Sequence, residues 1–308
     1  TAPRAVRVEP LSPNAEQQRV LDLAPGHGPV LVLGGPGTGR SALAVEYAAR
    51  RIEAGLEPER LLVLTPTRQA SARLRDALSV RLDHGGRGTR TSTPVRTWAA
   101  YAFDLIRRAR TTGFLPAVQR TPRLLSGAEQ DTVIAELLES YAAGERGGPD
   151  WPADLAEAVL LQDYRDRLDL GMSEAFDPAG LLTTACLLLE ENPELLEGER
   201  TSLPVIVVDD LQEATPAVHR LLRALGTGQD VVALASPDTV VQGFRGARPD
   251  LVRDYPGCLL PRADSIEGRT HLLRTGYRMD GDVLQAWRRV ARRIPALPGT
   301  LEMRQGMT

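Results

Sequence analysis

Short apolar runs and longer stretches of helical spacing alternate along the chain. Apolar runs lie at residues 30–33, 60–64, 204–208 and 230–235, with weaker ones at 93–96 and 271–273. Runs of this length are typical of strands buried on both faces, and their alternation with helices favours a parallel sheet. The pattern therefore predicts an α/β fold in which helices cover both faces of a parallel sheet.

The intervals between these runs have the spacing of helices. The first predicted helix, within residues 11–23, has Ser12 or Asn14 as its cap, and the helix after residue 39 ends near Gly55, a C-terminal signal. Residues 83–91 are predicted to form a polar loop. Another helix is expected after residue 67, up to about residue 82. Further helices are expected at 97–110, through most of 115–170 and at 177–190. We interpret the long helical stretch at 115–170 as a small insertion domain.

The first apolar run leads into a glycine-rich stretch, residues 34–41, that reads GGPGTGRS. This is the pattern of a phosphate-binding loop with arginine at the lysine position. Backbone amides at a helix N-terminus attract an anion, and glycines let phosphate oxygens approach the backbone. A glycine-rich turn without a ligand is the alternative. We expect ATP to be bound by Gly34, Gly35, Gly37, Thr38, Gly39, Arg40 and Ser41, with Ser41 also a ligand of Mg²⁺.

Arg40 can be interpreted in two ways. A guanidinium is larger and more rigid than the ammonium of the usual lysine, so it would hold a γ-phosphate differently and impair hydrolysis. The chain contains no lysine at all, however, so Arg40 can also reflect a general compositional preference for arginine. The sequence favours impaired hydrolysis, because a compositional bias explains surface arginines better than one in a phosphate-binding loop.

Two carboxylates, Asp209 and Asp210, follow the apolar run at 204–208. In parallel sheets, ligands bind beyond the carboxyl ends of the strands. An acid in that place can hold Mg²⁺ through water, and its neighbour can position the attacking water. Capping of the next helix is the alternative role for these acids. We therefore expect Asp209 to be a metal ligand and Asp210 to be catalytic.

The charge of the chain is distributed unevenly. The net charge is −3, but residues 65–123 carry 12 arginines against three aspartates and no glutamate, a charge of +9, which leaves −12 for the rest. A basic segment in an acidic chain suggests a surface for a polyanion, the alternative being an ordinary solvated arginine-rich face. No apolar stretch is long enough to span a bilayer, and Cys186 and Cys258 lie far apart in sequence. We expect a cytoplasmic protein whose cysteines are core residues.

Taken together, these motifs resemble those of UvrD/Rep/PcrA-type superfamily 1 DNA helicases, whose first domain is a RecA-like P-loop NTPase sheet. The matching stretches are NAEQ at 14–17, the glycine loop at 34–41, TPTRQA at 65–70, RTWAA at 96–100, DDLQE at 209–213, QGFRGA at 242–247 and GYR at 276–278. The resemblance implies that Gln17 reads the adenine, that Tyr277 lies on its face and that Arg278 meets the γ-phosphate. It also implies that Gln212 belongs to the catalytic set. The residues implied to line a single-strand track are Thr65, Thr67, Arg68, Arg96, Trp98, Phe244 and Arg245. For the aromatic residues among them, ordinary core packing is the alternative.

The departures from the family pattern concern the hydrolytic machinery. Besides Arg40, the family's catalytic glutamate is replaced by the shorter Asp210, and its γ-phosphate-sensing glutamine falls on Thr239. Gly276, Pro66 and Ala99 replace the family's asparagine, aromatic residue and histidine in three further motifs. Phosphoryl transfer depends on positioning and charge, so we expect a weak ATPase.

The arginine-rich composition and the stretch RLLSGAEQ at 123–130 are most similar to AdnA subunits of actinobacterial AdnAB helicase–nucleases. This resemblance implies a motor subunit for processing DNA ends, with single-stranded DNA or duplex ends as substrate and an AdnB-like subunit as partner. The expected domains are a first RecA-like domain at 1–97 and 171–270, an insertion at 98–170 and a second RecA-like domain that starts at 271. The family's remaining motifs, and any nuclease domain, would lie beyond Thr308. A DNA-binding scaffold that supports an active partner motor is the alternative function, and an unrelated P-loop kinase is disfavoured.

Overall fold

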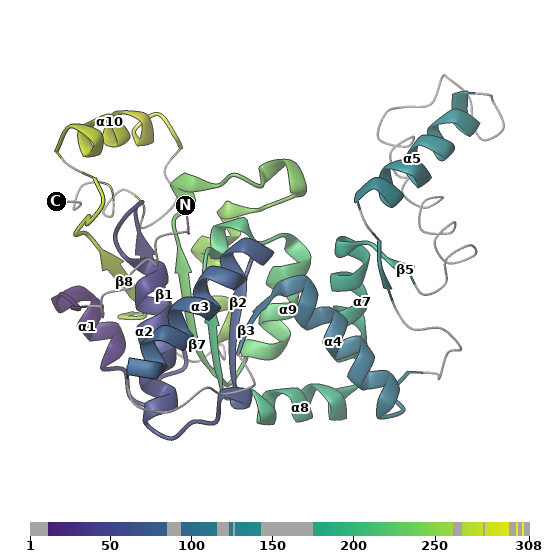
Figure 1. The fold of residues 1–308 in the computed structure, drawn as a ribbon, viewed down its shortest axis with the longest axis horizontal. Coiled ribbons are helices and arrows are strands. Elements are labelled where there is room, and N and C mark those ends of the chain that lie inside the picture. Colours follow the sequence, from purple (N-terminus) through teal and green to yellow (C-terminus); the bar gives the residue numbers. More distant parts are fainter. Residues whose placement is uncertain are drawn as a thin grey trace, which may run out of the picture. The chain divides into compact units, whose positions relative to one another are not determined.

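The computed structural model describes residues 12–84, 94–115, 123–125, 127–142, 175–260, 267–279 and 281–295, together with residues 300 and 304. These residues form two compact units, one of residues 1–101 with 189–308 and one of residues 102–188. The first unit holds a six-stranded sheet (Figure 1). The predicted loop residues 85–91 and the predicted helical residues 143–170 lie outside the described part.

The sheet is entirely parallel, with strand order β3-β2-β6-β7-β1-β8. Its strands are β1 (Pro29–Gly34), β2 (Leu61–Thr65), β3 (Val95–Thr97), β6 (Val205–Val208), β7 (Asp230–Ala235) and β8 (Thr270–Leu273). Every residue of β1, β2, β6 and β7 is buried, as expected for strands covered on both faces. The α/β fold with a parallel sheet predicted from the apolar runs is confirmed.

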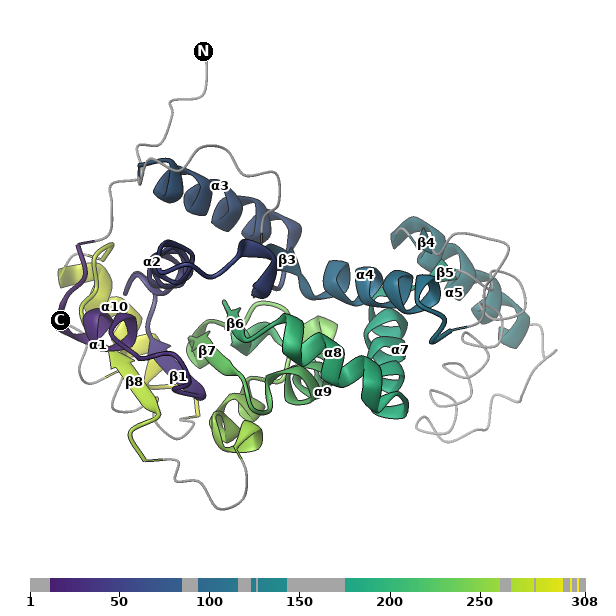
Figure 2. The same ribbon diagram turned by 90° about the horizontal axis from the view of Figure 1, so that it is seen from below.

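Helices cover both faces of this sheet. Figure 2 shows α2 (Arg40–Glu53) and α3 (Arg68–His84) on one face and α9 (Pro216–Gly226) on the other. Side chains of α2 and α3 pack with alternate residues of the strands in one cluster, which includes Tyr47, Leu74, Val207 and Val232. Further helices described in this unit are α1 (Ala15–Leu21), which contacts α2 and β8, α8 (Pro193–Ser202) and α10 (Gly281–Ala291).

The second unit is described in part. It holds most of α4 (Trp98–Thr111) and α7 (Pro178–Glu191), together with α5 (Gly127–Ala142). Two short strands, β4 (Arg123–Leu124) and β5 (Ala175–Phe176), pair in parallel, which the helical pattern of the insertion does not indicate. Across the described part of the chain, none of the helices combines the length and apolar character needed to cross a membrane.

One predicted domain boundary needs correction. The second RecA-like domain was expected to start at residue 271, but this position lies inside β8. β8 pairs with β1 from Leu31↔Thr270 to Gly34↔Leu273, so these residues belong to the same sheet as the phosphate-binding loop. The rest of the domain division stays a prediction.

The order of the strands in the sheet decides which strand ends lie next to one another. β7 is flanked by β1 on one side and β6 on the other, so the carboxyl ends of these three strands are adjacent. The glycine loop follows β1, Asp209 and Asp210 follow β6, and Ser236 follows β7. The topology therefore brings the polar segments of three distant parts of the chain to one edge of the sheet.

Candidate functional site

The glycine loop is a tight turn that ends in a helix of 14 residues. Gly37 and Gly39 have φ of 80° and 82°, which only glycine adopts without strain, and Gly39 is the N-cap of α2. The Thr38 hydroxyl donates to Gly35 O at 2.9 Å and closes the turn from within. The first amides of a helix have no acceptor within it, so a helix that begins in a glycine turn of this kind is the arrangement that binds phosphate groups.

Ser41 and Asp209 are in direct contact. The Ser41 hydroxyl donates to Asp209 Oδ2 at 2.8 Å, and Asp209 is only 1% exposed. Burial, reinforced by the charge of Asp210, raises the pKa of Asp209 to about 6, against the opposing effects of Ser41 and Arg40. Asp209 Oδ1 is buried and has no hydrogen-bond partner among the described residues. An unsatisfied carboxylate oxygen beside a hydroxyl needs a ligand, because leaving a buried acceptor unpaired is costly.

These two oxygens meet the requirements of a magnesium site. Mg²⁺ takes few protein oxygens and keeps several waters, so a hydroxyl and one carboxylate beside a phosphate loop are sufficient. In the described ranges no three His, Cys, Asp or Glu side chains cluster as a self-contained metal site. Ser41 and Asp209 therefore fit a metal that arrives with a nucleotide, and they do not form a metal site of their own.

The Arg40 side chain folds back onto its own loop. Its guanidinium donates to Gly34 O, to Gly35 O at 2.9 Å and to Asp210 Oδ1 at 3.2 Å. Asp210 also accepts from Gln212 Nε2 at 2.9 Å. Its φ of 55° is the one positive value at a non-glycine residue in the part of the chain described. Such a backbone conformation is strained, and it is often found at functional sites. The two residues expected to act on the γ-phosphate and on water are thus paired with each other.

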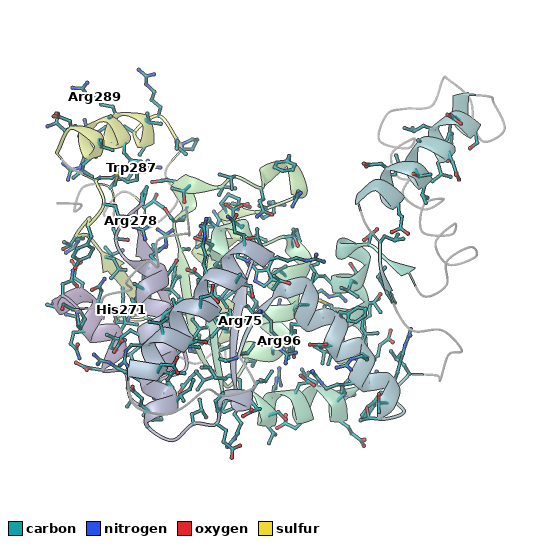
Figure 3. The ribbon with its side chains drawn as sticks, viewed as in Figure 1. Arg75, Arg96, His271, Arg278, Trp287 and Arg289 are labelled. Carbon is teal, nitrogen blue, oxygen red and sulfur yellow. The ribbon has the colours of Figure 1, made fainter. Side chains whose placement is uncertain are left out.

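The segment after β8 returns to the glycine loop. Tyr277 N donates to Gly37 O at 3.0 Å, and a Cβ placed on Gly37 would lie 3.1 Å from Arg278 Cβ. Figure 3 labels Arg278 in this segment, between β8 and α10. Tyr277 and Arg278 are both exposed, so their side chains are available to a ligand at the loop. The structure brings together the glycine loop, the two aspartates and these two residues, as the sequence predicted.

Gln17 occupies the same end of the site but is fully buried. Its Oε1 accepts from Asn14 N at 3.1 Å in a capping box, and its Nε2 donates to Thr38 O at 3.3 Å. Of the two caps considered from the sequence, Asn14 is the one present. Gln17 therefore ties α1 to the glycine loop, and a contact with a base would have to replace one of these bonds.

The residues expected along a single-strand track differ in exposure. Phe244 is 82% exposed, and the Arg245 guanidinium lies 5.3 Å from the centre of its ring. Arg68 is exposed at the start of α3, and Arg96 (Figure 3) is half-buried on β3. Thr67 accepts from Ala70 N at 3.1 Å and caps α3.

Two of the expected DNA contacts are buried. Thr65 is 0% exposed, and its hydroxyl donates to Thr67 O at 3.3 Å. Trp98, at the start of α4, is 6% exposed. Burial of this extent favours the alternative in which Trp98 is an ordinary core residue, because a base cannot stack on a ring that is already covered.

Side chains of the turn after β6 link it to the end of β7 and to the segment that follows β7, and one of them, Glu213, received no role from the sequence. Gln212 Oε1 accepts from Ser236 N at 2.9 Å, so its amide links the end of β6 to the end of β7. Glu213 accepts from Val241 N and Gln242 N, and Thr239 donates its hydroxyl to Ser236 O at 3.0 Å. The sequence contains Glu213 within the DDLQE stretch, but its partners are 28 and 29 residues away, and no local pattern indicates them.

Comparisons with known proteins agree with this geometry. The chain is 22% identical over 258 residues to a putative ATP-dependent DNA helicase, YjcD of Bacillus subtilis, which covers 75% of this chain and 33% of the relative. It is 22% identical over 302 residues to the ATP-dependent DNA helicase PcrA of Staphylococcus epidermidis, which covers 89% of this chain and 39% of the relative. PcrA of Staphylococcus aureus is 21% identical over 301 residues, with the same coverage. The chain thus spans about a third to two fifths of the length of these relatives and is distantly homologous to superfamily 1 helicases of the UvrD/PcrA type.

The family model that matches is AAA_19, described as an AAA domain, over residues 17–245. This range starts at Gln17 and includes the glycine loop, both aspartates and Phe244. An AAA-type P-loop domain implies ATP binding. Since the match covers most of the sequence, the chain belongs to the AAA_19 family of AAA domains.

Proposed function

We propose that this chain is the ATP-binding part of a DNA helicase motor that acts on single-stranded DNA or duplex ends, with a weak ATPase site. The observation that carries the proposal is the convergence on the glycine loop of two segments distant in sequence, residues 209–210 and the segment that contains Tyr277. Ser41 meets Asp209, Arg40 meets Asp210, and Tyr277 N is bonded to Gly37 O. A glycine-rich turn without a ligand needs none of these contacts.

Each residue at the loop has a defined task in this proposal. The amides at the start of α2 would bind the phosphates, and Arg278 would contact the γ-phosphate. Ser41 and Asp209 would hold Mg²⁺, whose positive charge would neutralise the phosphate oxygens. Tyr277 lies against the adenine.

Weak hydrolysis follows from the pairing of Arg40 with Asp210. Asp210 is one methylene shorter than the glutamate of the resembling family and already accepts from Arg40 and Gln212. Both bonds are made to Asp210 Oδ1, so this oxygen is already occupied and is less available to orient an attacking water. Thr239, where that family has a glutamine, uses its hydroxyl on Ser236 O. These features act on one transition state, so their effects combine non-additively.

The DNA contact proposed is the surface that bears Phe244, Arg245, Arg68 and Arg96. Single-stranded DNA is bound by arginines along the phosphates and by aromatic rings against bases, with little sequence preference. The resemblance to AdnA supports the further proposal that the chain works in a helicase–nuclease with an AdnB-like partner subunit. The alternative, a DNA-binding scaffold without catalysis, is favoured by the same Arg40–Asp210 pair.

The test is nucleotide binding and DNA-stimulated phosphate release by the full-length protein, alone and with its partner subunit. A fluorescent ATP analogue is expected to bind in the presence of Mg²⁺, and Asp209→Ala is expected to weaken the Mg²⁺-dependent part of that binding. Slow phosphate release that rises with single-stranded DNA supports the motor, while binding without any release supports the scaffold. Absence of nucleotide binding under all conditions contradicts both.

A further inference from the structure

The carboxylate of Glu213 holds the segment that carries the exposed aromatic ring. Glu213 is 5% exposed and belongs to the short 3₁₀ turn η2 (Leu211–Glu213) that follows the two aspartates. One of its oxygens accepts from Val241 N at 2.9 Å, and the other accepts from Gln242 N at 2.8 Å. Both carboxylate oxygens are thus used on two consecutive backbone amides.

The segment held in this way is a surface turn, η4 (Gly243–Arg245), which is built around Gln242. Gln242 O accepts from Arg245 N at 2.8 Å and from Ala247 N at 3.3 Å. Val241, just before Gln242, is 73% exposed, and Phe244, in the middle of η4, is 82% exposed, so both side chains point to solvent. Local bonds shape this turn, but the Glu213 carboxylate is what attaches its first residues to the turn after β6.

The chemistry of this contact depends on both the charge and the length of Glu213. Hydrogen bonds from amides to an ionised carboxylate are about twice as strong as neutral ones. A glutamine in its place offers one acceptor oxygen and turns an NH₂ group towards the second amide, which leaves a part-buried donor without its acceptor. An aspartate is one methylene shorter and cannot extend as far towards the two amides.

We propose that Glu213 is a positioning residue for DNA binding, which fixes residues 241–246 so that the Phe244 ring is presented to a base of the single strand. The inference rests on the proposed function, because it needs a strand at Phe244. Glu213 itself touches neither strand nor nucleotide. Its neighbour Gln212 bonds to Asp210 and Ser236, so the same short turn also contacts the nucleotide site.

The experiment compares Glu213→Gln with Phe244→Ala, with the double variant and with the charge-matched control Asp250→Asn. Asp250 lies in η5 (Pro249–Asp254), which packs against η2, and pairs with Arg248 on the surface. The measurements are binding of an oligo-dT strand by fluorescence anisotropy, binding of a fluorescent ATP analogue, and hydrogen exchange of the peptide that contains residues 241–247.

Glu213→Gln is expected to weaken strand binding on the order of tenfold, as loss of one stacked base does, with nucleotide affinity unchanged. This direction is opposite to simple electrostatics, in which removal of a negative charge tightens DNA binding, as Asp250→Asn should show. The double variant should bind no more weakly than Phe244→Ala alone. Exchange should rise at residues 241–247 and stay unchanged in β6 and β7.

Three results overturn the inference. If Glu213→Gln binds the single strand as tightly as wild type while Phe244→Ala binds it more weakly, Glu213 has no positioning role, but the proposed DNA contact at Phe244 is retained. Faster exchange throughout β6 and β7, or a matching loss in nucleotide affinity, shows a general structural role. Unchanged binding by Phe244→Ala refutes the proposed DNA contact, and the inference falls with it. If Glu213→Gln folds poorly, the same comparison is made with Glu213→Asp.

Discussion

The guanidinium of Arg40, a residue of the glycine loop, lies 3.2 Å from the Asp210 carboxylate. Arg40 begins α2 and Asp210 follows β6, so 170 residues separate them in sequence. The same guanidinium also donates to Gly34 O and Gly35 O. If Arg40 is to bind a nucleotide, these hydrogen bonds must be replaced by bonds to phosphate. The net contribution of the guanidinium to nucleotide affinity is therefore lowered.

Arg40→Lys is expected to raise ATP turnover. A lysine has a compact, flexible head and no rigid fork, so it can leave Asp210 and reach a γ-phosphate. Recovery of one well-placed electrostatic group corresponds to a factor of up to about 10²–10³ in kcat. The measurement is phosphate release in the presence of single-stranded DNA.

The matched control is Arg50→Lys, on the same helix, where the side chain pairs with Glu46 and Asp22 away from the loop. It should leave turnover unchanged. If Arg40→Lys releases no phosphate, the cause of weak hydrolysis lies elsewhere, at Asp210 or Thr239.

Gly37→Ala is expected to destabilise the protein and to weaken nucleotide binding. The residue has φ of 80°, and the new Cβ would lie 3.1 Å from Arg278 Cβ. Strain at such a φ costs about 1–3 kcal/mol, and the clash moves the segment that contains Tyr277. Urea unfolding and titration with a fluorescent ATP analogue give the two quantities.

Gly55→Ala is the control, because it introduces backbone strain without a contact to another segment. Gly55 has φ of 105°, and no atom lies within 4 Å of an added Cβ. It should lower the free energy of unfolding but leave nucleotide affinity unchanged. Equal losses of affinity in both variants would argue against a role of the Gly37–Arg278 contact.

Arg81→Ala is expected to lower the free energy of unfolding by about 1.5–3 kcal/mol, the range for hydrogen bonds to charged groups. Arg81 on α3 bonds to Glu46 at 2.7 Å and Glu53 at 2.7 Å on α2, and Glu46 is 6% exposed. Its loss leaves the Glu46 carboxylate with its bond from Arg50 Nε on the same helix, at 3.0 Å. Chemical denaturation measures the change.

The exposed pair Arg220–Glu190 provides the comparison, since both side chains are more than 40% exposed. Arg220→Ala should cost at most about 1 kcal/mol, because exposed ion pairs contribute little. A larger loss for Arg220→Ala than for Arg81→Ala would contradict the role assigned to burial.

His27 should make stability depend on pH near neutrality. Burial lowers the pKa of His27 below its ordinary 6.5, although Asp230 opposes the effect, and its Nε2 lies 2.8 Å from Tyr47 Oη. The unfolded chain therefore binds a proton that the folded protein does not, at pH values between the lowered pKa and 6.5. Stability is fully present above 6.5 and is lost as the pH falls below it.

The check is the free energy of unfolding of wild type and His27→Gln, measured by urea at several pH values from about 5.5 to 7.5. The wild type should lose more stability than the variant as the pH falls. Asp209, whose pKa is raised, contributes to both proteins and cancels in the difference. Parallel pH profiles would show that His27 titrates in the same way folded and unfolded.

Local pattern was sufficient for the strands of the six-stranded sheet and for most helix limits in the described part of the chain. The glycine loop, its α2 helix ending at Glu53 and the strand before Asp209 lie where the sequence places them. Each depends on residues close in sequence, namely apolar runs, caps and glycines that permit positive φ. The edge of the sheet at which the polar motifs meet could also be predicted, because parallel strands align their carboxyl ends.

Partners of individual side chains could not be predicted in the same way. Arg40 was expected on a phosphate and lies on Asp210, Trp98 is buried, and β8 joins the sheet of β1. Glu213 finds its two amides in a segment that no periodicity connects to it. Residue types and their spacing thus determined the α/β fold and the set of residues at the loop. Strand order and register, which pair residues up to 239 positions apart in the described sheet (Leu31 with Thr270), decided which of them touch, because hydrogen bonds depend on distances of a few ångströms.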